Sequence, residues 1–241
     1  MTHLSVNLNK IGLLRNSRGR DYPNMVTMAE RVLNLGAFGL TIHPRPDQRH
    51  ATYQDAFDLK SLLVKYPGKE LNIEGFPTEE FLKIVLEVVP DQCTLVPDDP
   101  NQLTSDHGWN LGRDQDALRP IIAKLTDRGI RVALFMDPNP ESMSLAKAIG
   151  ADRVELYTEA YANAYGTQNE TQVLAQYMDA AQAAQDVGLE VNAGHDLDLN
   201  NVQALCRSGV ITEVSIGHAL TVEALDLGWD KVVQSYLAKL A

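Results

Sequence analysis

The sequence predicts a (β/α)8 barrel, the TIM-barrel architecture, with extra helices in its long βα loops. Three observations predict it. The 241 residues are close to the ~250 typical of this fold. Short runs rich in Val, Ile, Leu and Thr alternate with longer helical patterns, and eight such strand–helix units can be counted. No G-x-G-x-x-G follows the first run, as a dinucleotide-binding open sheet would require. No linker-like segment divides the chain, so we expect one domain over residues 1–241.

The expected strands are short and mostly apolar, as is typical of parallel strands that are covered on both faces. In chain order they are residues 4–8, 38–42, 70–74, 92–96, 130–136, 153–157, 189–193 and 213–217. Two connections after strands, 97–113 and 158–169, are longer than ordinary ones. Loops that follow strands lie at the catalytic face of a barrel, so we expect both to border the site.

The expected helices carry recognisable start and stop signals. The pattern over 25–36 ends at Gly36, and the long pattern over 171–188 ends at Gly188, where a left-handed residue usually terminates a helix. The helix over 77–89 opens with proline and with acidic residues in its first turn. Pro120 lies inside the pattern over 114–128, which predicts either a start near Arg119 or a kink.

Composition excludes several classes of protein. Basic and acidic side chains number 21 and 32, a net charge of −11, which argues against general binding to nucleic acid. The two cysteines have no metal-site spacing, the N-terminus lacks a signal-peptide pattern, and no run reaches the ~20 apolar residues of a membrane span. We therefore expect a cytoplasmic protein without a membrane partner. Residues 1–50 nevertheless hold seven basic residues against three acidic ones, which favours phosphate binding there.

Histidines and glutamates follow the expected strands, where a barrel places its catalytic groups. His43 ends the second strand, His195 follows the seventh, and His50 lies further along the loop of His43. Glu74 ends the third strand within an apolar run, and Glu155 lies within the sixth. A glutamate buried in such a strand either pairs or has a shifted pKa suited to proton transfer. We expect a direct role for Glu74 and a supporting hydrogen bond from Glu155.

Glycine–histidine pairs close the seventh and eighth strands, at Gly194-His195 and Gly217-His218. The loops after these two strands commonly bind phosphate in barrels, through backbone N–H groups where a helix begins. Together with the basic N-terminal portion, they predict two phosphate sites on one rim. The ligand is then a bisphosphate or a pair of phosphorylated substrates.

Several segments together resemble the pyridoxine 5'-phosphate synthase family of vitamin B6 biosynthesis. They are VNLNKIGLLRNSRGRDYPN, LTIHPRPDQRH, LNIEG, TLVPD, VELYTEAYA, VNAGHDLDLNN and VSIGHAL, in that order over residues 4–235. The resemblance implies a barrel that condenses 1-deoxy-D-xylulose 5-phosphate with 3-amino-2-oxopropyl phosphate. The products are pyridoxine 5'-phosphate, phosphate and water. It further implies no metal or organic cofactor and a homo-octamer, for which helices at 170–187 and 220–240 could supply contacts.

The resemblance also implies roles for individual residues. His43 corresponds to the general base, Glu74 to a second proton acceptor and His195 to the proton donor. The residues that correspond to ligands of deoxyxylulose phosphate are Arg45, His50 and Thr104. Those that correspond to ligands of the aminoketone phosphate are Asn7, Arg18, Gly217 and His218. Loop 97–113 is expected to close over the substrates.

Two departures from the family pattern affect the expected binding site. Asn9-Lys10 stands where many members have Asp-His, and Asp196 stands where many have glycine. Lys10 could bind a phosphate, whereas Asp196 would repel one unless it turns away or pairs with a cation. Two alternatives stay open. One is a metal-dependent barrel hydrolase or isomerase with His43, Glu74, His195 and His218 as ligands; the other is a phosphosugar-binding barrel without activity.

Overall fold

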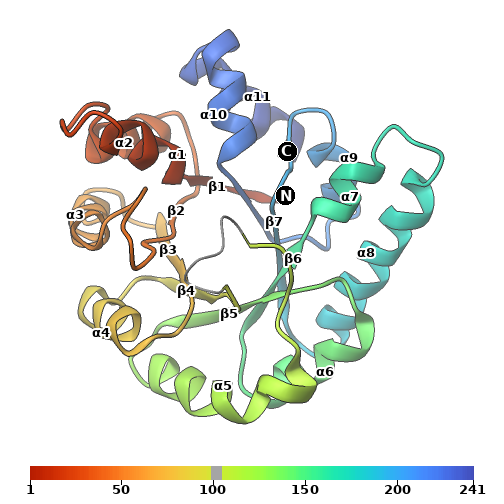
Figure 1. Cartoon of the computed structure of the whole chain (residues 1–241). Helices are drawn as coiled ribbons and strands as arrows, with labels where there is room; N and C mark the ends of the chain where they lie inside the picture. Colours follow the sequence, from red (N-terminus) through yellow and green to blue (C-terminus); the bar gives the residue numbers. More distant parts are fainter. Residues whose placement is uncertain (99–104) are drawn as a thin grey trace.

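Eight parallel strands close into a barrel in the order in which they occur along the chain (Figure 1). The computed structural model describes residues 1–98 and 105–241. Each strand pairs with its neighbours in the sequence, and β1 closes the barrel against β8 through pairs such as Val6–Ile216. The strands are β1 (His3–Asn7), β2 (Gly39–Ile42), β3 (Glu70–Gly75), β4 (Gln92–Leu95), β5 (Arg131–Met136), β6 (Arg153–Tyr157), β7 (Glu190–Gly194) and β8 (Glu213–Ile216). The predicted fold is confirmed.

Helices surround the barrel, and within residues 1–98 and 105–241 three βα connections carry more than one helix (Figure 1). The extra helices follow β1, β6 and β8, so the prediction of additional helices is confirmed. The helices are α1 (Asn9–Asn16), α2 (Met25–Asn34), α3 (Tyr53–Leu63), α4 (Glu79–Val88), α5 (Leu111–Thr126), α6 (Pro140–Ala148), α7 (Glu159–Ala164), α8 (Glu170–Asp186), α9 (Val202–Cys206), α10 (His218–Leu227) and α11 (Trp229–Leu240). Among the described residues, none of these helices combines the length and apolarity that crossing a bilayer requires.

Local sequence explains where several helices begin. The Asn24 side chain accepts a hydrogen bond from the N–H of Thr27 at the start of α2. Thr52 and Asp55 form a capping box at the start of α3, and the Thr78 hydroxyl caps α4. These contacts satisfy N–H groups that lack partners within the helix. They fix the angle at which each helix leaves the loop that borders the barrel mouth.

Of the two expectations for the helix around Pro120, a start near Arg119 is wrong. Helix α5 begins at Leu111, and Pro120 lies well inside it. Proline lacks the N–H that bonds to the preceding turn, and its ring crowds the carbonyl four residues earlier, but packing on a barrel can hold a helix together through both effects. Leu111, Leu118, Ile122 and Leu125 are buried along α5, and this packing outweighs the local preference.

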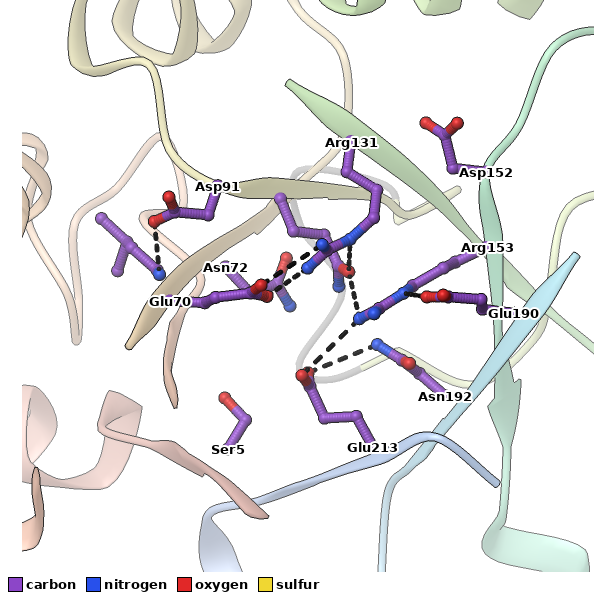
Figure 2. A network of polar contacts seen from close by, with 12 residues as sticks. Ser5, Glu70, Asn72, Asp91, Arg131, Asp152, Arg153, Glu190, Asn192 and Glu213 are labelled. Atoms are coloured by element: carbon purple, nitrogen blue, oxygen red, sulfur yellow. Dashed lines mark hydrogen bonds and ion pairs between the residues drawn. The ribbon is translucent and has the colours of Figure 1, made fainter. Parts of the chain in front are cut away.

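The barrel interior at the N-terminal ends of the strands, which we call the lower layer, is charged rather than apolar (Figure 2). The Arg131 guanidinium pairs with Glu70, and the Arg153 guanidinium lies 2.5 Å from Glu190 and 3.6 Å from Glu213. Both arginines also donate to the Gln92 side-chain oxygen, at 3.0 Å each. Burial raises the pKa of Glu213 to about 7 despite the nearby Arg153. This layer closes the end of the barrel opposite the catalytic face.

More polar side chains extend from this charged layer toward the carboxyl ends of the strands. The Thr94 hydroxyl is 3.0 Å from the Asn72 side-chain oxygen and 3.4 Å from Glu155. Asn192, on β7, donates to Glu213 at 3.3 Å. Polar side chains therefore connect the closed end of the barrel with the carboxyl ends of the strands, where the candidate site lies.

Candidate functional site

A cavity of about 550 Å³ opens at the carboxyl ends of the strands. Twelve of the fourteen residues predicted for the site line it: Asn7, Asn9, Lys10, His43, Arg45, His50, Glu74, Glu155, His195, Asp196, Gly217 and His218. They come from six segments that are far apart in the sequence. Arg18 is exposed beyond the end of α1 and does not line the cavity, while Thr104 lies outside the described residues. The roles expected for these residues stay predictions.

A chain of side-chain hydrogen bonds ties the first three strands together at the cavity floor. The Asn7 amide donates to Glu74 at 3.5 Å, and the Asn7 oxygen accepts from the N–H of Asn9 at 3.0 Å. The Asn9 oxygen in turn accepts from the N–H of His43 at 2.8 Å. Asn9 stands where many family members have aspartate, and an aspartate oxygen can accept the same hydrogen bond. The substitution therefore preserves the link between β1 and His43.

The wall formed by the β2–α3 loop is basic, and its histidines are neutral. His43 is 7% exposed, and its ring lies 6.0 Å from that of His50. Burial lowers the pKa of His43 well below its usual range, and the charges of Arg45 and Arg49 lower it further. Burial and the same arginines lower the pKa of His50 to about 4. A neutral imidazole in this place can accept a proton at neutral pH.

Arg45 is held by a buried carboxylate that sequence reasoning missed. Its guanidinium pairs with Asp98, and both side chains are almost fully buried. The Ser105 hydroxyl donates to the same carboxylate at 2.9 Å. Burial lowers the pKa of Arg45 slightly from its very high ordinary value. Asp98 lies three residues after β4, where the strand-end rule that selected Glu74 could have found it.

Two carboxyl groups meet on the floor of the cavity. Burial raises the pKa of Glu74 well above its ordinary value, and the neighbouring Glu155 raises it further. Burial also raises the pKa of Glu155, to about 7, although the Thr94 hydroxyl donates to it. Two nearby carboxyl groups in a site of low polarity cannot both ionise easily. The pair therefore holds a proton at neutral pH that it can exchange.

His195 occupies an unusual turn after β7. Its φ is 90°, and that of Asp196 is 56°. Residues other than glycine rarely adopt this region of backbone conformation. A Cβ on the preceding Gly194 would lie 2.4 Å from a Glu155 oxygen, so only glycine lets the carboxyl sit there. The Tyr157 ring meets the His195 ring edge-on at 5.0 Å. The Asp196 carboxylate lies 3.3 Å from His195 Nδ1, turned toward a histidine rather than toward Lys or Arg.

Two helix N-termini reach the cavity. Helix α10 begins at His218, directly after Gly217, and α1 begins at Asn9, with Lys10 in its first turn. A Cβ on Gly217 would lie 2.9 Å from the Asn7 Cβ, so glycine is needed for the close approach of β8 to β1. Backbone N–H groups at the start of a helix favour anions. Both predicted phosphate regions thus have suitable donors.

The cavity lining carries charges of both signs. Lys10, Arg45 and Arg49 follow β1 and β2, whereas Asp106, Glu159 and Asp196 follow β4, β6 and β7. Sequence reasoning missed Glu159 and also Tyr157, whose hydroxyl donates to Glu159. Tyr157 is the last residue of β6, so a rule applied to aromatic as well as charged strand ends would have selected it.

Within residues 1–98 and 105–241, no group of three or more His, Cys, Asp or Glu side chains is placed to hold a metal ion. The four residues considered as metal ligands, His43, Glu74, His195 and His218, all line the cavity without forming such a group.

Comparison with known proteins gives matches over nearly the whole chain. A pyridoxine 5'-phosphate synthase from Albidiferax ferrireducens is 48% identical over 246 residues, covering 100% of this chain and 98% of the relative. The one from Brucella abortus is 50% identical over 244 residues, covering 99% and 98%. Among solved structures, a phosphoribosyl anthranilate isomerase from Thermus thermophilus has a TM-score of 0.61 at 14% identity, covering 99% of this chain and 98% of that one. That similarity supports the barrel fold alone.

The family profile described as "Pyridoxal phosphate biosynthesis protein PdxJ" matches residues 4–241. This range includes every strand except the first residue of β1, and it includes all residues that line the cavity. The chain therefore belongs to the PdxJ family of pyridoxal phosphate biosynthesis proteins.

Proposed function

We propose that this protein is a pyridoxine 5'-phosphate synthase. It condenses 1-deoxy-D-xylulose 5-phosphate with 3-amino-2-oxopropyl phosphate to give pyridoxine 5'-phosphate, phosphate and water. Membership of the PdxJ family and the names of relatives at about half identity support this activity. The observation that carries the proposal is a neutral His43 and a proton-holding Glu74 in one cavity that also receives two helix N-termini.

The reaction requires repeated proton transfer, and the cavity supplies groups for it. An amine adds to a ketone and water leaves, phosphate then leaves and water adds, and closure to the aromatic ring releases two further molecules of water. The neutral His43 imidazole is suited to accept the first proton. The pair of Glu74 and Glu155 is suited to take up and return protons, because both have raised pKa values. His195, which lines the same cavity, is suited to donate a proton to a leaving group.

The charges of the cavity match the two substrates. Both carry a phosphate, which Lys10, Arg45 and the helix N-termini at Asn9 and His218 can bind. Two anion sites on one rim fit two phosphorylated molecules held side by side. Holding the reactants in one orientation replaces a bimolecular encounter and accounts for a large part of the rate acceleration.

The direct test mixes both substrates with enzyme that has been stripped of metal by a chelator. We expect pyridoxine 5'-phosphate and one equivalent of inorganic phosphate, measured by chromatography and by a phosphate assay. Activity that disappears with the metal and returns with one stoichiometric ion would instead support the metal-dependent alternative. Binding of deoxyxylulose phosphate without any product would support the inactive phosphosugar-binding alternative.

Variants of the proton-transfer residues test the assignment of each one. We expect His43→Ala and Glu74→Gln each to lose at least 100-fold in kcat, the lower range for general acid–base catalysis. Both proteins should keep the circular dichroism spectrum of the wild type. A near-wild-type kcat in either variant would remove that residue from the mechanism.

We further propose that the protein works as a cytoplasmic homo-octamer. Leu13 and Leu14 on α1 and Val222 and Leu225 on α10 are large apolar side chains with substantial exposure, and these two helices contact each other. Exposed apolar side chains on two helices in contact favour association. Analytical ultracentrifugation tests the octamer, and Leu225→Lys should reduce its sedimentation coefficient.

A further inference from the structure

We propose that Asp196 is a positioning residue for His195: its carboxylate accepts the Nδ1 proton of the imidazole, so that Nε2 exchanges the proton with substrate. This inference rests on the proposed function, in which His195 is the proton donor. It assigns to Asp196 a role other than phosphate binding. In other enzymes in which a carboxylate orients a catalytic histidine, the carboxylate likewise binds one ring nitrogen while the other transfers the proton.

The backbone turn after β7 makes this contact between neighbouring residues. Successive side chains of an extended strand point to opposite faces, so adjacent residues on a strand do not meet. Here the φ angles of 90° at His195 and 56° at Asp196 turn the chain into the left-handed region twice in succession. The Asp196 Oδ2 consequently lies 3.3 Å from His195 Nδ1, and both side chains line the cavity.

The turn is held in this conformation by buried hydrogen bonds. The Thr158 N–H and hydroxyl donate to the Gly194 carbonyl at 3.0 and 2.7 Å, and the hydroxyl also contacts the His195 carbonyl. The Asn201 amide donates to the Asp196 carbonyl at 3.1 Å. A strained backbone persists only where its surroundings determine it, and such strain is concentrated at functional sites. Three consecutive carbonyls are fixed here, so the two side chains have little freedom to separate.

Electrostatics keep Asp196 able to accept this hydrogen bond. The hydrogen bond from His195 lowers the pKa of Asp196, although its partial burial opposes this. The carboxylate is therefore ionised at neutral pH and accepts the imidazole proton. The Tyr157 ring packs edge-on against the imidazole and limits its rotation. The other titratable groups that face the pair are Glu155 on β6, Asp106 in the β4–α5 loop, Glu159 on α7 and His218 on α10.

A general acid must present its proton to the substrate in one orientation, and the contact with Asp196 holds the imidazole in that orientation. Removing the carboxylate should therefore lower kcat more than it changes KM. The pair is partly exposed, with 24% of the His195 side chain and 45% of the Asp196 side chain accessible. For a hydrogen bond at this exposure we expect kcat to fall roughly three- to tenfold.

The test measures kcat and KM of the full-length enzyme in two variants with opposite backbone effects. Asp196→Asn keeps a side chain that tolerates positive φ, and Asp196→Gly removes the strain as well as the side chain. We expect the same loss of kcat with little change in KM in both variants, and a return toward the wild-type kcat in Asp196→Glu. Because both variants lose the charge but differ in strain, agreement between them assigns the effect to the carboxylate.

Glu159→Gln is the matched control, since it removes one negative charge from the lining of the same cavity and keeps an oxygen for Tyr157. Its kcat should fall by clearly less than that of Asp196→Asn. If Asp196 only repels a phosphate, both Asp196 variants will lower KM for 3-amino-2-oxopropyl phosphate and leave kcat unchanged, which overturns the inference. A wild-type enzyme that makes no pyridoxine 5'-phosphate would contradict the proposed function instead.

Discussion

Gly12, in the middle of α1, lies against the backbone of the loop that carries His50. A Cβ built on Gly12 would be 2.6 Å from both the carbonyl carbon and oxygen of His50, and 2.9 Å from the N atom of Ala51. Ordinary contact begins near 3.4 Å, so Gly12→Ala must move helix and loop apart by several tenths of an ångström. Because the opposing atoms are backbone, no side-chain rotation can relieve the overlap.

Two effects of opposite sign compete in Gly12→Ala. Alanine stabilises a helix interior by about 1 kcal/mol relative to glycine. Overpacking a buried contact costs about 1–3 kcal/mol. The loop cannot retreat freely, because the Asn16 side chain on α1 donates to the carbonyls of Gln48 and His50, at 3.1 and 2.8 Å. We therefore expect a net loss of about 1 kcal/mol, which lowers the melting temperature by about 2–4 °C in a chain of this size.

The functional consequence of Gly12→Ala follows from the displaced loop. KM for 1-deoxy-D-xylulose 5-phosphate should rise several-fold with a smaller change in kcat, since His50 moves while Glu74 and His195 keep their positions. Steady-state kinetics and calorimetry measure both effects. Gly112→Ala is the control, because Gly112 is exposed in α5 and its Cβ would approach only an Asn110 side-chain oxygen, at 3.3 Å. If Gly12→Ala gains stability and keeps its KM, the close approach does not constrain the site.

Two further predictions concern buried carboxyl groups. Glu213 has a pKa of about 7 in the folded protein against an ordinary value of 4.5, so the folded protein holds an extra proton. The contribution of this group to stability is therefore present below about pH 4.5 and is lost as the pH rises toward 7. Urea unfolding from pH 4.5 to 7.5 should show wild type losing stability relative to Glu213→Gln as pH rises; parallel curves would contradict this. Gly194→Ala should place a Cβ 2.4 Å from a Glu155 oxygen. We expect this variant to lose at least tenfold in kcat with little change in its circular dichroism spectrum. An unchanged kcat would show that the Glu155 carboxyl can move without consequence.

Strand positions were predictable from the sequence because burial on both faces leaves a simple pattern. All eight predicted strands occur, and no strand end differs from its predicted position by more than one residue. Closure of the barrel then places every strand end on one rim. For this reason His43, Glu74 and His195 could be assigned to a common face before any side-chain geometry was known.

The contacts among these residues were not predictable in the same way. The bond from the His43 N–H to Asn9 depends on how β1 and β2 are staggered, and the burial of Asp98 against Arg45 depends on the path of the β4 loop. The sequence Gly194-His195-Asp196 does not indicate two successive positive φ angles. That turn exists because Thr158, on another segment, holds its carbonyls.

Glutamates on the strands illustrate what the three-dimensional arrangement adds. Glu70 and Glu74 lie on one strand, at opposite ends, and look equivalent in sequence as carboxylates beside apolar residues. Glu70 pairs with the Arg131 guanidinium in the charged lower layer, whereas Glu74 accepts from a neutral Asn7 amide and faces Glu155. A neutral donor compensates burial far less than a guanidinium does, so the pKa of Glu74 rises and the group is suited to proton exchange. The register of β3 in the closed barrel thus separates a structural carboxylate from a candidate catalytic one only four residues away.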